Sequence, residues 1–277
     1  MTQVSLPTHP YVDVSLNYLE RTGERPVNYA ITPPAGQPQR SGHVLSTPVR
    51  VHNARLLAEP PTLDGNGFQV VRQASALHDF SDDQLIRAVY YPEVESLLKR
   101  TTGASRVVIF DHTQRLGRLG HSEPGLREPA QRVHNDQTFA SGPRRVRDHL
   151  PPDEAEQLLR KRHGIINVWR GAGAPVLTWP LALCDARSID LDRDLIASDL
   201  VYPDKVGETY AFAPNPAHRW LYYPSLQTDE VLLLKIFDSL SDGTARLTAH
   251  TSFEDPSSAA GAAPRRSIEV RSLVFWD

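Results

Sequence analysis

The pattern of hydrophobic and polar positions changes near Gly103. Between residues 79 and 102, apolar residues recur near helical spacing, Asp79 and Ser81 are candidate N-caps, and Pro92 divides the segment into two helical pieces. Beyond Gly103, short runs rich in Val, Ile, Tyr, Phe and Trp alternate with turn residues, which is typical of β-strands. The predicted strands are 106–113, 166–170, 175–185, 208–214, 219–224, 230–239, 245–250 and 266–276.

Two further segments complete the predicted architecture. Residues 151–164 predict a helix that begins at two prolines and carries basic residues near its end. Residues 1–60 are rich in proline and predict an extended N-terminal arm. We expect a mainly β fold with helical buttresses, a double-stranded β-helix (jelly roll, cupin-like), formed by residues 61–277 as a single domain.

Composition narrows the function classes. Hydrophobic residues make up 40%, enough for a sizeable core, and the net charge of -3 does not suggest a nucleic-acid or membrane-surface protein. The single cysteine, Cys184, excludes an intrachain disulfide and fits a reducing interior. The sequence shows neither a secretory signal nor a stretch of about 20 apolar residues. We therefore expect a cytoplasmic protein with a small-molecule substrate and no nucleic-acid or membrane partner; the oligomeric state stays open.

His134 and Asp136 are the strongest candidates for chemistry. On an extended segment, residues i and i+2 point to the same side, so both can reach one metal ion. Two imidazoles and one carboxylate form the ligand set of non-haem Fe(II) oxygenases. The third ligand is either His250 or His218. We favour His250 because an Arg-x-Ser run follows it, although each histidine could equally be an ordinary hydrogen-bonded residue.

An oxygenase of this type needs an electron source besides its substrate, and 2-oxoglutarate is the usual one. Its far carboxylate requires a planar bidentate donor, for which Arg265 is the candidate, with the Ser267 hydroxyl beside it. The strand phase is ambiguous, because Ile268 and Val270 share a face with Arg266 and could point inward instead. If Arg265 faces inward, Glu269 and Arg271 share its face and can pair with each other.

Other residues are candidates for substrate contact. The strand at 166–170 and the segment after the His-x-Asp motif contain them: Asn167, Trp169, Arg170 and Arg147. Packing aromatics and solvated arginines are at least as common as ligands of this kind.

A resemblance to a known family adds to these arguments. The strings VHNDQT, INVWR, PLALCDARSID, DEVLLLKIFDS and PRRSIEVRSLVFW resemble the hydroxylase/desaturase family of fungal gibberellin desaturase and AsaB-type proteins, and CmcJ-like proteins are similar. The resemblance runs from about Leu63 to the C-terminus. It implies an iron- and 2-oxoglutarate-type oxidase of secondary metabolites, with His134 and Asp136 at the His-x-Asp positions and Arg265 at the family arginine.

These observations predict an Fe(II)/2-oxoglutarate-dependent dioxygenase that uses O2. It would hydroxylate, desaturate or oxidatively cyclise a small secondary metabolite or amino-acid-derived substrate at an unactivated C–H bond. Two alternatives belong to other classes: a non-catalytic jelly-roll protein that binds a metabolite or metal, and a zinc hydrolase or isomerase built on the same ligands.

Overall fold

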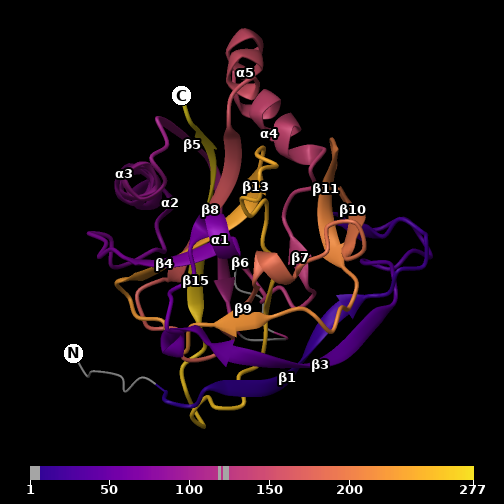
Figure 1. Cartoon of the computed structure of the whole chain (residues 1–277), viewed down its shortest axis with the longest axis vertical. Helices are drawn as coiled ribbons and strands as arrows, with labels where there is room; N and C mark the ends of the chain where they lie inside the picture. The colour runs from indigo at the N-terminus through magenta and orange to yellow at the C-terminus, as the bar shows by residue number, and fades with distance from the viewer. Residues whose placement is uncertain (1–6, 118–119, 121–124) are drawn as a thin grey trace.

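Two β-sheets face each other across a shared interior in the computed structural model, which describes residues 7–117, 120 and 125–277 (Figure 1). The larger sheet has nine strands, in spatial order β1 (Tyr11–Leu19), β3 (Val44–Asn53), β12 (Trp220–Tyr222), β9 (Leu181–Cys184), β14 (His250–Ser252), β7 (His134–Asn135), β11 (Val206–Phe212), β10 (Leu195–Val201) and β2 (Val27–Tyr29). The smaller has six, in the order β4 (Phe68–Arg72), β13 (Glu230–Asp238), β8 (His163–Gly171), β15 (Arg266–Phe275), β5 (Arg106–Leu116) and β6 (Leu126–Arg127). The predicted mainly β jelly-roll class is confirmed.

Helices buttress this pair of sheets from outside. They are α1 (Leu63–Asn66), α2 (Asp83–Leu85), α3 (Tyr91–Thr102), α4 (Ser141–His149) and α5 (Pro152–Leu159), with a π-helical turn at Ile86–Tyr90 and 3₁₀ turns at Ala54–Leu56 and Ala186–Ser188. In Figure 1, α3 lies beside the six-stranded sheet, and α4 and α5 stand together at one end of the molecule. Pro92 lies in the first turn of α3, directly after the π-helical turn, and the helical backbone continues through this point from Asp83 to Thr102. The predicted division into two helical pieces was therefore wrong, because the π-helical turn accommodates the proline without a break.

Several predicted element boundaries were wrong for identifiable reasons. The N-cap of α2 is Asp82, whose side chain accepts hydrogen bonds from Gln84 N and Leu85 N. Asp79 instead lies in a preceding turn, where its Oδ1 accepts a hydrogen bond from Ser81 N. The helix predicted to reach residue 164 ends at Leu159, because His163 and Gly164 pair with strands on both sides as the start of β8. Helix α4 was not predicted.

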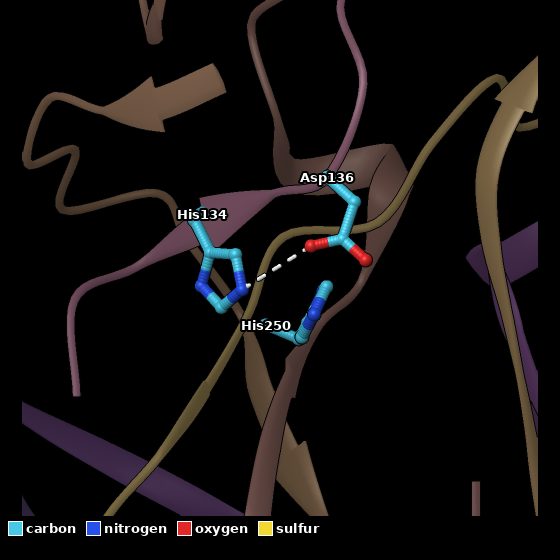
Figure 2. Close-up of side chains that lie close together, drawn as sticks. All are labelled: His134, Asp136 and His250. Atoms are coloured by element: carbon cyan, nitrogen blue, oxygen red, sulfur yellow. Dashed lines mark ion pairs between the residues drawn. The ribbon is translucent and has the colours of Figure 1, made fainter. Parts of the chain in front are cut away.

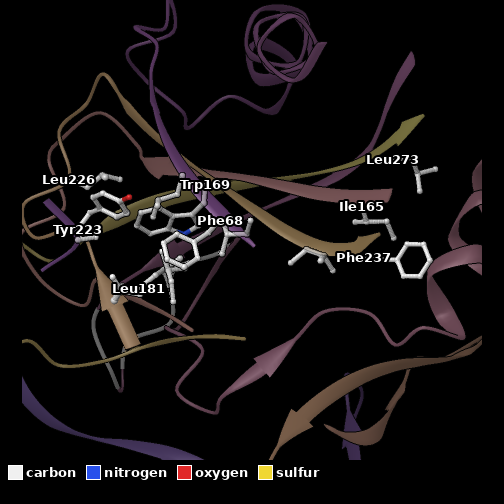
Figure 3. Packing of buried hydrophobic residues seen from close by; sticks show 14 of the residues in the cluster. Phe68, Ile165, Trp169, Leu181, Tyr223, Leu226, Phe237 and Leu273 are labelled. Atoms are coloured by element: carbon white, nitrogen blue, oxygen red, sulfur yellow. The ribbon is translucent and has the colours of Figure 1, made fainter. Parts of the chain in front are cut away.

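The space between the sheets is filled by a hydrophobic cluster drawn from both of them. Phe68, Trp169 and Phe237 come from the six-stranded sheet, and Leu181 and Leu183 from the nine-stranded sheet (Figure 3). Each side chain is less than a tenth exposed. A fully buried side chain of this size is worth about 1.5–3 kcal/mol relative to an exposed one, so this cluster holds the two sheets together.

The structure shows which face of β15 points into the interior, a question that the sequence left open. Ile268, Val270 and Val274 pack with Leu97 and Leu98 of α3 on the outer face of the six-stranded sheet. The alternate residues therefore face the interior between the sheets, and among them are Ser267, Glu269 and Arg271. Polar side chains occupy part of that interior because the apolar face of the strand is covered by a helix.

The N-terminal segment contributes three strands to the nine-stranded sheet. β1 pairs with β3 in an antiparallel register from Tyr11↔His52 to Leu19↔Val44, and β3 pairs in parallel with β12. The division between an arm at 1–60 and a domain at 61–277 stays a prediction. In the part of the chain that the structure describes, we find no helix with the length and hydropathy needed to cross a membrane.

Candidate metal centre

Three side chains converge inside the barrel: two lie on the adjacent strands β7 and β14, and the third is the residue that directly follows β7. One ligand atom each of His134, Asp136 and His250 lies within 4.8 Å of the other two, and Figure 2 shows the side chains pointing toward one another. Among the described residues this is the only group of three or more such side chains close enough to share a metal ion. No fourth ligand joins this group within the part of the chain that the structure describes, so a bound ion would keep coordination positions free for small molecules.

Strand pairing brings the two histidines together across 116 residues of sequence. β7 and β14 are antiparallel neighbours whose register pairs His250 directly with His134, and the ring centroids are 4.4 Å apart. His134 Nδ1 hydrogen-bonds to Arg132 O at 2.8 Å, which makes Nδ1 the protonated nitrogen and leaves Nε2 as a lone-pair donor. That Nε2 lies 3.5 Å from Asp136 Oδ1.

Asp136 is held by its other oxygen. Oδ2 accepts a hydrogen bond from Asn167 Nδ2 at 2.8 Å and another from Arg271 Nε at 3.2 Å. Asn167 comes from β8 and Arg271 from β15, so two strands of the opposite sheet fix the carboxylate. Oδ1, facing His134, is thereby the oxygen left for a metal ion.

The ionisation states suit a divalent cation. Burial and the neighbouring His250 lower the pKa of His134 to about 4, and burial lowers the pKa of His250. Burial alone would raise the pKa of Asp136, but Arg271 and the two imidazoles hold it well below its usual range. At neutral pH the centre therefore contains two neutral imidazoles and one carboxylate, the forms that bind metal.

Arg265 lies nearby with its donors only partly used. Its side chain is 1% exposed, and Nη1 donates to Ser252 Oγ at 2.9 Å and to the Trp179 carbonyl. Nε, Nη2 and the Ser267 hydroxyl are buried without a partner among the described residues. Burial and the charge of Arg115 lower the pKa of Arg265 to about 9. A buried cation that has free donors and contacts no carboxylate of the described residues is arranged to receive an anion.

His218, the alternative third ligand, lies elsewhere. Its Nε2 donates to Asp194 Oδ2 at 2.9 Å, and its Nδ1 is 2.9 Å from the Tyr18 hydroxyl. Both ring nitrogens are used, and the structure does not bring His218 to the other two residues.

The four candidate substrate residues lie in different places. Asn167 and Trp169 face the interior, Asn167 against Asp136 and the Trp169 ring 5.4 Å from Arg265 Cζ. Arg170 faces the other side of β8, where its guanidinium lies 5.7 Å from the Tyr90 ring and donates to the Thr228 carbonyl. Arg147 pairs with Glu156 on the exposed faces of α4 and α5. The structure does not bring Arg170 or Arg147 to the candidate centre.

Sequence reasoning missed the contact of Arg271 with the centre. Glu269 and Arg271 were expected only to pair with each other, which they do at 2.7 Å, but Arg271 also holds Asp136. The signal on β15 was alternation: polar residues at every second position of a strand whose other residues are mostly apolar indicate a polar interior face. Arg115, on β5, was not singled out, and the polar neighbours His112 and Gln114 give no such alternation there.

Comparisons with known proteins agree with this geometry. Residues 16–275 match the family described as "Oxidoreductase/YMDC permease-like domain". The chain is 35% identical to the hydroxylase/desaturase CTB9 of Cercospora beticola, over 98% of this chain and 89% of CTB9, and 34% identical to the hydroxylase/desaturase efuI of Hormonema carpetanum, over 97% and 96%. A solved structure of the iron and alpha-ketoglutarate-dependent endoperoxidase NvfI superimposes with a TM-score of 0.87 at 30% identity, covering 97% of this chain and 99% of NvfI.

The chain therefore belongs to the hydroxylase/desaturase family of oxidoreductases, which includes Fe(II)/2-oxoglutarate-dependent dioxygenases. The predicted enzyme class, and Fe(II), 2-oxoglutarate and O2 as its cofactor and cosubstrates, are confirmed at the level of the family. The narrower likeness to gibberellin desaturase and CmcJ-like proteins stays a prediction.

Proposed function

We propose that His134, Asp136 and His250 bind Fe(II) and that the protein uses it for 2-oxoglutarate-dependent oxidation of a small molecule. The outcome would be hydroxylation, desaturation or oxidative cyclisation at an unactivated C–H bond of a secondary metabolite or amino-acid-derived substrate. The observation that carries this proposal is the convergence of two imidazole nitrogens and one carboxylate oxygen within 4.8 Å inside the barrel.

The donor set excludes calcium and magnesium, which prefer oxygen ligands. Catalytic zinc can use the same three ligands, so the preference for Fe(II) over zinc is supported by the iron-dependent relatives. Two histidines and one carboxylate with open positions are the ligand set of non-haem iron oxygenases. Bound iron, with 2-oxoglutarate and O2, would supply the oxidising power that removes a hydrogen atom from carbon.

The protein's own residues position and shield that chemistry. Asn167 and Arg271 occupy Asp136 Oδ2, so the carboxylate would offer one oxygen and not chelate. The buried Trp169 and Phe68 belong to the cluster that fills the adjoining interior and excludes water from it.

Arg265 and Ser267 would bind the distal carboxylate of 2-oxoglutarate. The guanidinium has Nε and Nη2 unused, and the Ser267 hydroxyl is likewise unpartnered within the described residues. A carboxylate there would neutralise a buried charge and accept the orphaned donors, which supports this assignment over a purely structural role.

The remaining proposals concern partners and location. A small molecule suits a centre buried between two sheets. The net charge of -3 supports the absence of a nucleic-acid or membrane-surface partner. The free thiol of Cys184, buried in the core, is consistent with a cytoplasmic protein.

An anaerobic titration tests the proposed centre. Fe(II) and then 2-oxoglutarate are added to the metal-free protein while the weak visible charge-transfer band of the iron chelate is followed. We expect a band in the wild type and in His218→Ala, and none in His250→Ala. Arg265→Ala should require a much higher 2-oxoglutarate concentration.

Other outcomes separate the rival functions. A wild type that binds iron without developing the band would indicate an oxidase that does not use 2-oxoglutarate. Turnover that is independent of O2 would indicate a hydrolase or isomerase instead. A band lost in His218→Ala but retained in His250→Ala would overturn the proposed ligand set.

A further inference from the structure

The candidate metal centre is closed on three sides and open to solvent on the side of β5. The side chains of His134 and Asp136 are 23% and 17% exposed, so solvent reaches the centre. The other sides are closed by side chains that are at most 2% exposed: Arg265 and Trp169 toward the cosubstrate anchor, Asn135 toward β13, and Leu273 and Phe275 toward α4 and α5. A substrate must therefore approach the centre along β5.

Asp111 of β5 lies on this open side, one guanidinium group away from the centre. Arg271 donates from Nε to Asp136 Oδ2 at 3.2 Å and from Nη1 to Asp111 Oδ1 at 3.1 Å. The Asp111 side chain is 53% exposed. Arg271 thus joins the carboxylate of a candidate metal ligand to a second carboxylate at the solvent.

A β-bulge turns two consecutive side chains of β5 toward the open side. In the register of β5 and β15, Asp111 lies opposite Arg271 and Ile109 opposite Ser272, so Phe110 is the extra residue. Phe110 packs against the interior cluster, whereas Ile109 packs on the outer face of the sheet. Neighbours on a regular strand face opposite ways, so only the bulge lets Phe110 and Asp111 both point inward. Bulges commonly re-aim side chains next to active sites.

Phe110 adds an aromatic surface beside the carboxylate. Its ring is stacked on the exposed His149 at the end of α4, with the centroids 4.9 Å apart and an interplanar angle of 18°. The two rings come from a strand and a helix far apart in the sequence. The open side therefore presents an apolar surface and an acidic group next to each other.

The carboxylate of Asp111 keeps an oxygen for a further hydrogen bond. Oδ1 accepts from Arg271, and Oδ2 accepts no hydrogen bond from the residues that the structure describes. Arg271 also pairs with Asp136 and Glu269, so its single charge is shared among three carboxylates. A half-exposed carboxylate oxygen of this kind attracts a hydrogen-bond donor and repels an anion.

We propose that Asp111 recognises the substrate: its Oδ2 accepts a hydrogen bond from a hydroxyl or ammonium group, while an apolar part of the substrate lies against Phe110 and His149. This inference rests on the proposed function, because it takes the molecule that approaches along β5 as the substrate to be oxidised. It narrows the substrate class to small molecules that carry such a donor near the oxidised C–H bond.

Titrations of the anaerobic Fe(II)–2-oxoglutarate complex with three probes test the assignment. The probes share a phenylethyl body and differ in one group: 2-phenylethylamine carries an ammonium, 2-phenylethanol a hydroxyl and 3-phenylpropanoate a carboxylate. Calorimetry gives the affinity, and a change in the visible band of the iron chelate shows that the probe lies beside the metal.

The proteins are the wild type, Asp111→Asn, Asp111→Ala and Asp13→Asn. Asp13 is the matched control, because it is also an exposed aspartate that lies opposite an arginine across an antiparallel register. It faces Arg50 in the pairing of β1 and β3, and its Oδ1 accepts from Arg50 Nε at 3.0 Å.

The wild type should bind the amine and the alcohol more tightly than 3-phenylpropanoate, and the tighter of the two identifies the donor. Asp111→Asn loses the charge but keeps a carbonyl oxygen, so the affinity for 2-phenylethylamine should fall about tenfold and that for 2-phenylethanol by less than about threefold. Asp111→Ala also loses the acceptor and should weaken both probes. Asp13→Asn should behave as wild type.

Four results would overturn the role of Asp111 alone. They are unchanged affinities in both Asp111 variants, an equal loss for all three probes in Asp111→Asn, a wild type that prefers 3-phenylpropanoate, and a wild type that forms the band but binds no probe. The equal loss would show that Asp111 acts only by positioning Arg271. If Asp111→Ala does not fold, Asp111→Asn decides by the same readings. A wild type that forms no band would instead refute the proposed function itself.

Discussion

Two groups of buried histidine and aspartate side chains occur in this molecule, and their difference separates a candidate metal centre from a structural network. The open group consists of His134, Asp136 and His250. The closed group consists of His218, Asp194, Tyr18, Trp220 and Asn215. Both groups contain histidine and aspartate, so the presence of these two residue types does not distinguish them.

In the closed group, the side-chain donors find their acceptors within the group, and Asp194 Oδ2 also accepts from Asp190 N at 2.7 Å. Trp220 Nε1 donates to the Tyr18 hydroxyl at 2.8 Å, Tyr18 donates to His218 Nδ1, and His218 Nε2 donates to Asp194. Asn215 Nδ2 adds bonds of 3.1 Å to both Asp194 oxygens. A neutral His218 satisfies this chain completely, and no lone pair of the imidazole remains for a metal ion.

In the open group, ligand atoms face one another without bonding. His134 Nε2 and Asp136 Oδ1 are 3.5 Å apart, and one ligand atom of each of the three residues lies within 4.8 Å of the other two. Outer hydrogen bonds hold the far sides of His134 and Asp136. A metal site requires ligand atoms whose lone pairs point to one place and whose side chains are oriented by hydrogen bonds on the far side. A structural network instead requires that each buried donor has an acceptor.

The largest contrast is expected from removing each aspartate. Asp136→Ala should abolish 2-oxoglutarate-dependent succinate release, because the only anionic ligand is lost, while its melting temperature stays near that of wild type. Asp194→Asn should do the reverse, losing stability while retaining activity per folded molecule. Succinate release and thermal unfolding measure both. Full activity in Asp136→Ala would refute the open group as the metal centre.

A pair of asparagines gives a matched test of the outer hydrogen bonds. Asn167→Ala frees Asp136 Oδ2 from one of its two donors, so we expect metal affinity to fall by about 10- to 100-fold. Asn215→Ala removes the equivalent donor from Asp194 and should leave metal affinity unchanged. Titration with Mn(II), followed by its electron paramagnetic resonance signal, measures the affinity. Equal effects of both variants would show that Asn167 acts only through overall stability.

Removing the hydroxyl of Tyr18 tests the closed group alone. Tyr18→Phe leaves His218 Nδ1 and Trp220 Nε1 buried without their partner, which should lower the free energy of unfolding by about 1–3 kcal/mol. Urea unfolding gives this quantity, and the affinity for 2-oxoglutarate serves as the control. Unchanged stability would mean that water replaces the hydroxyl at no cost.

The smallest effect is a pH dependence of stability from His218. Burial lowers its pKa, which the neighbouring Asp194 opposes. The unfolded chain therefore binds the proton more readily, and the free energy of unfolding should fall as the pH drops below about 6.5. His218→Gln should have a shallower slope between pH 7 and pH 5 than wild type. An identical slope would assign the dependence to other buried histidines.

Much of the site could be predicted because strand alternation is a local rule. His134 and Asp136 share a face since they are two residues apart, and Arg265 shares one with Ser267 for the same reason. The sequence of a strand does not show which of its two faces is buried in the interior, however. In β15, helix α3 covers Ile268 and Val270, so Glu269 and Arg271 on the opposite face point inward.

The sequence by itself determined the mainly β class and the family resemblance, and it supplied the candidate metal ligands and the candidate cosubstrate anchor, because periodicity and short motifs depend on residues that are close in the chain. Only the tertiary structure decided between His250 and His218 as the neighbour of His134, since that depends on which strands pair across 116 residues. It also decided the role of Asn167, which reaches Asp136 from the opposite sheet. Hydrogen bonds between distant strands leave no local pattern, and this is why the contact of Arg271 with Asp136 emerges only from the fold.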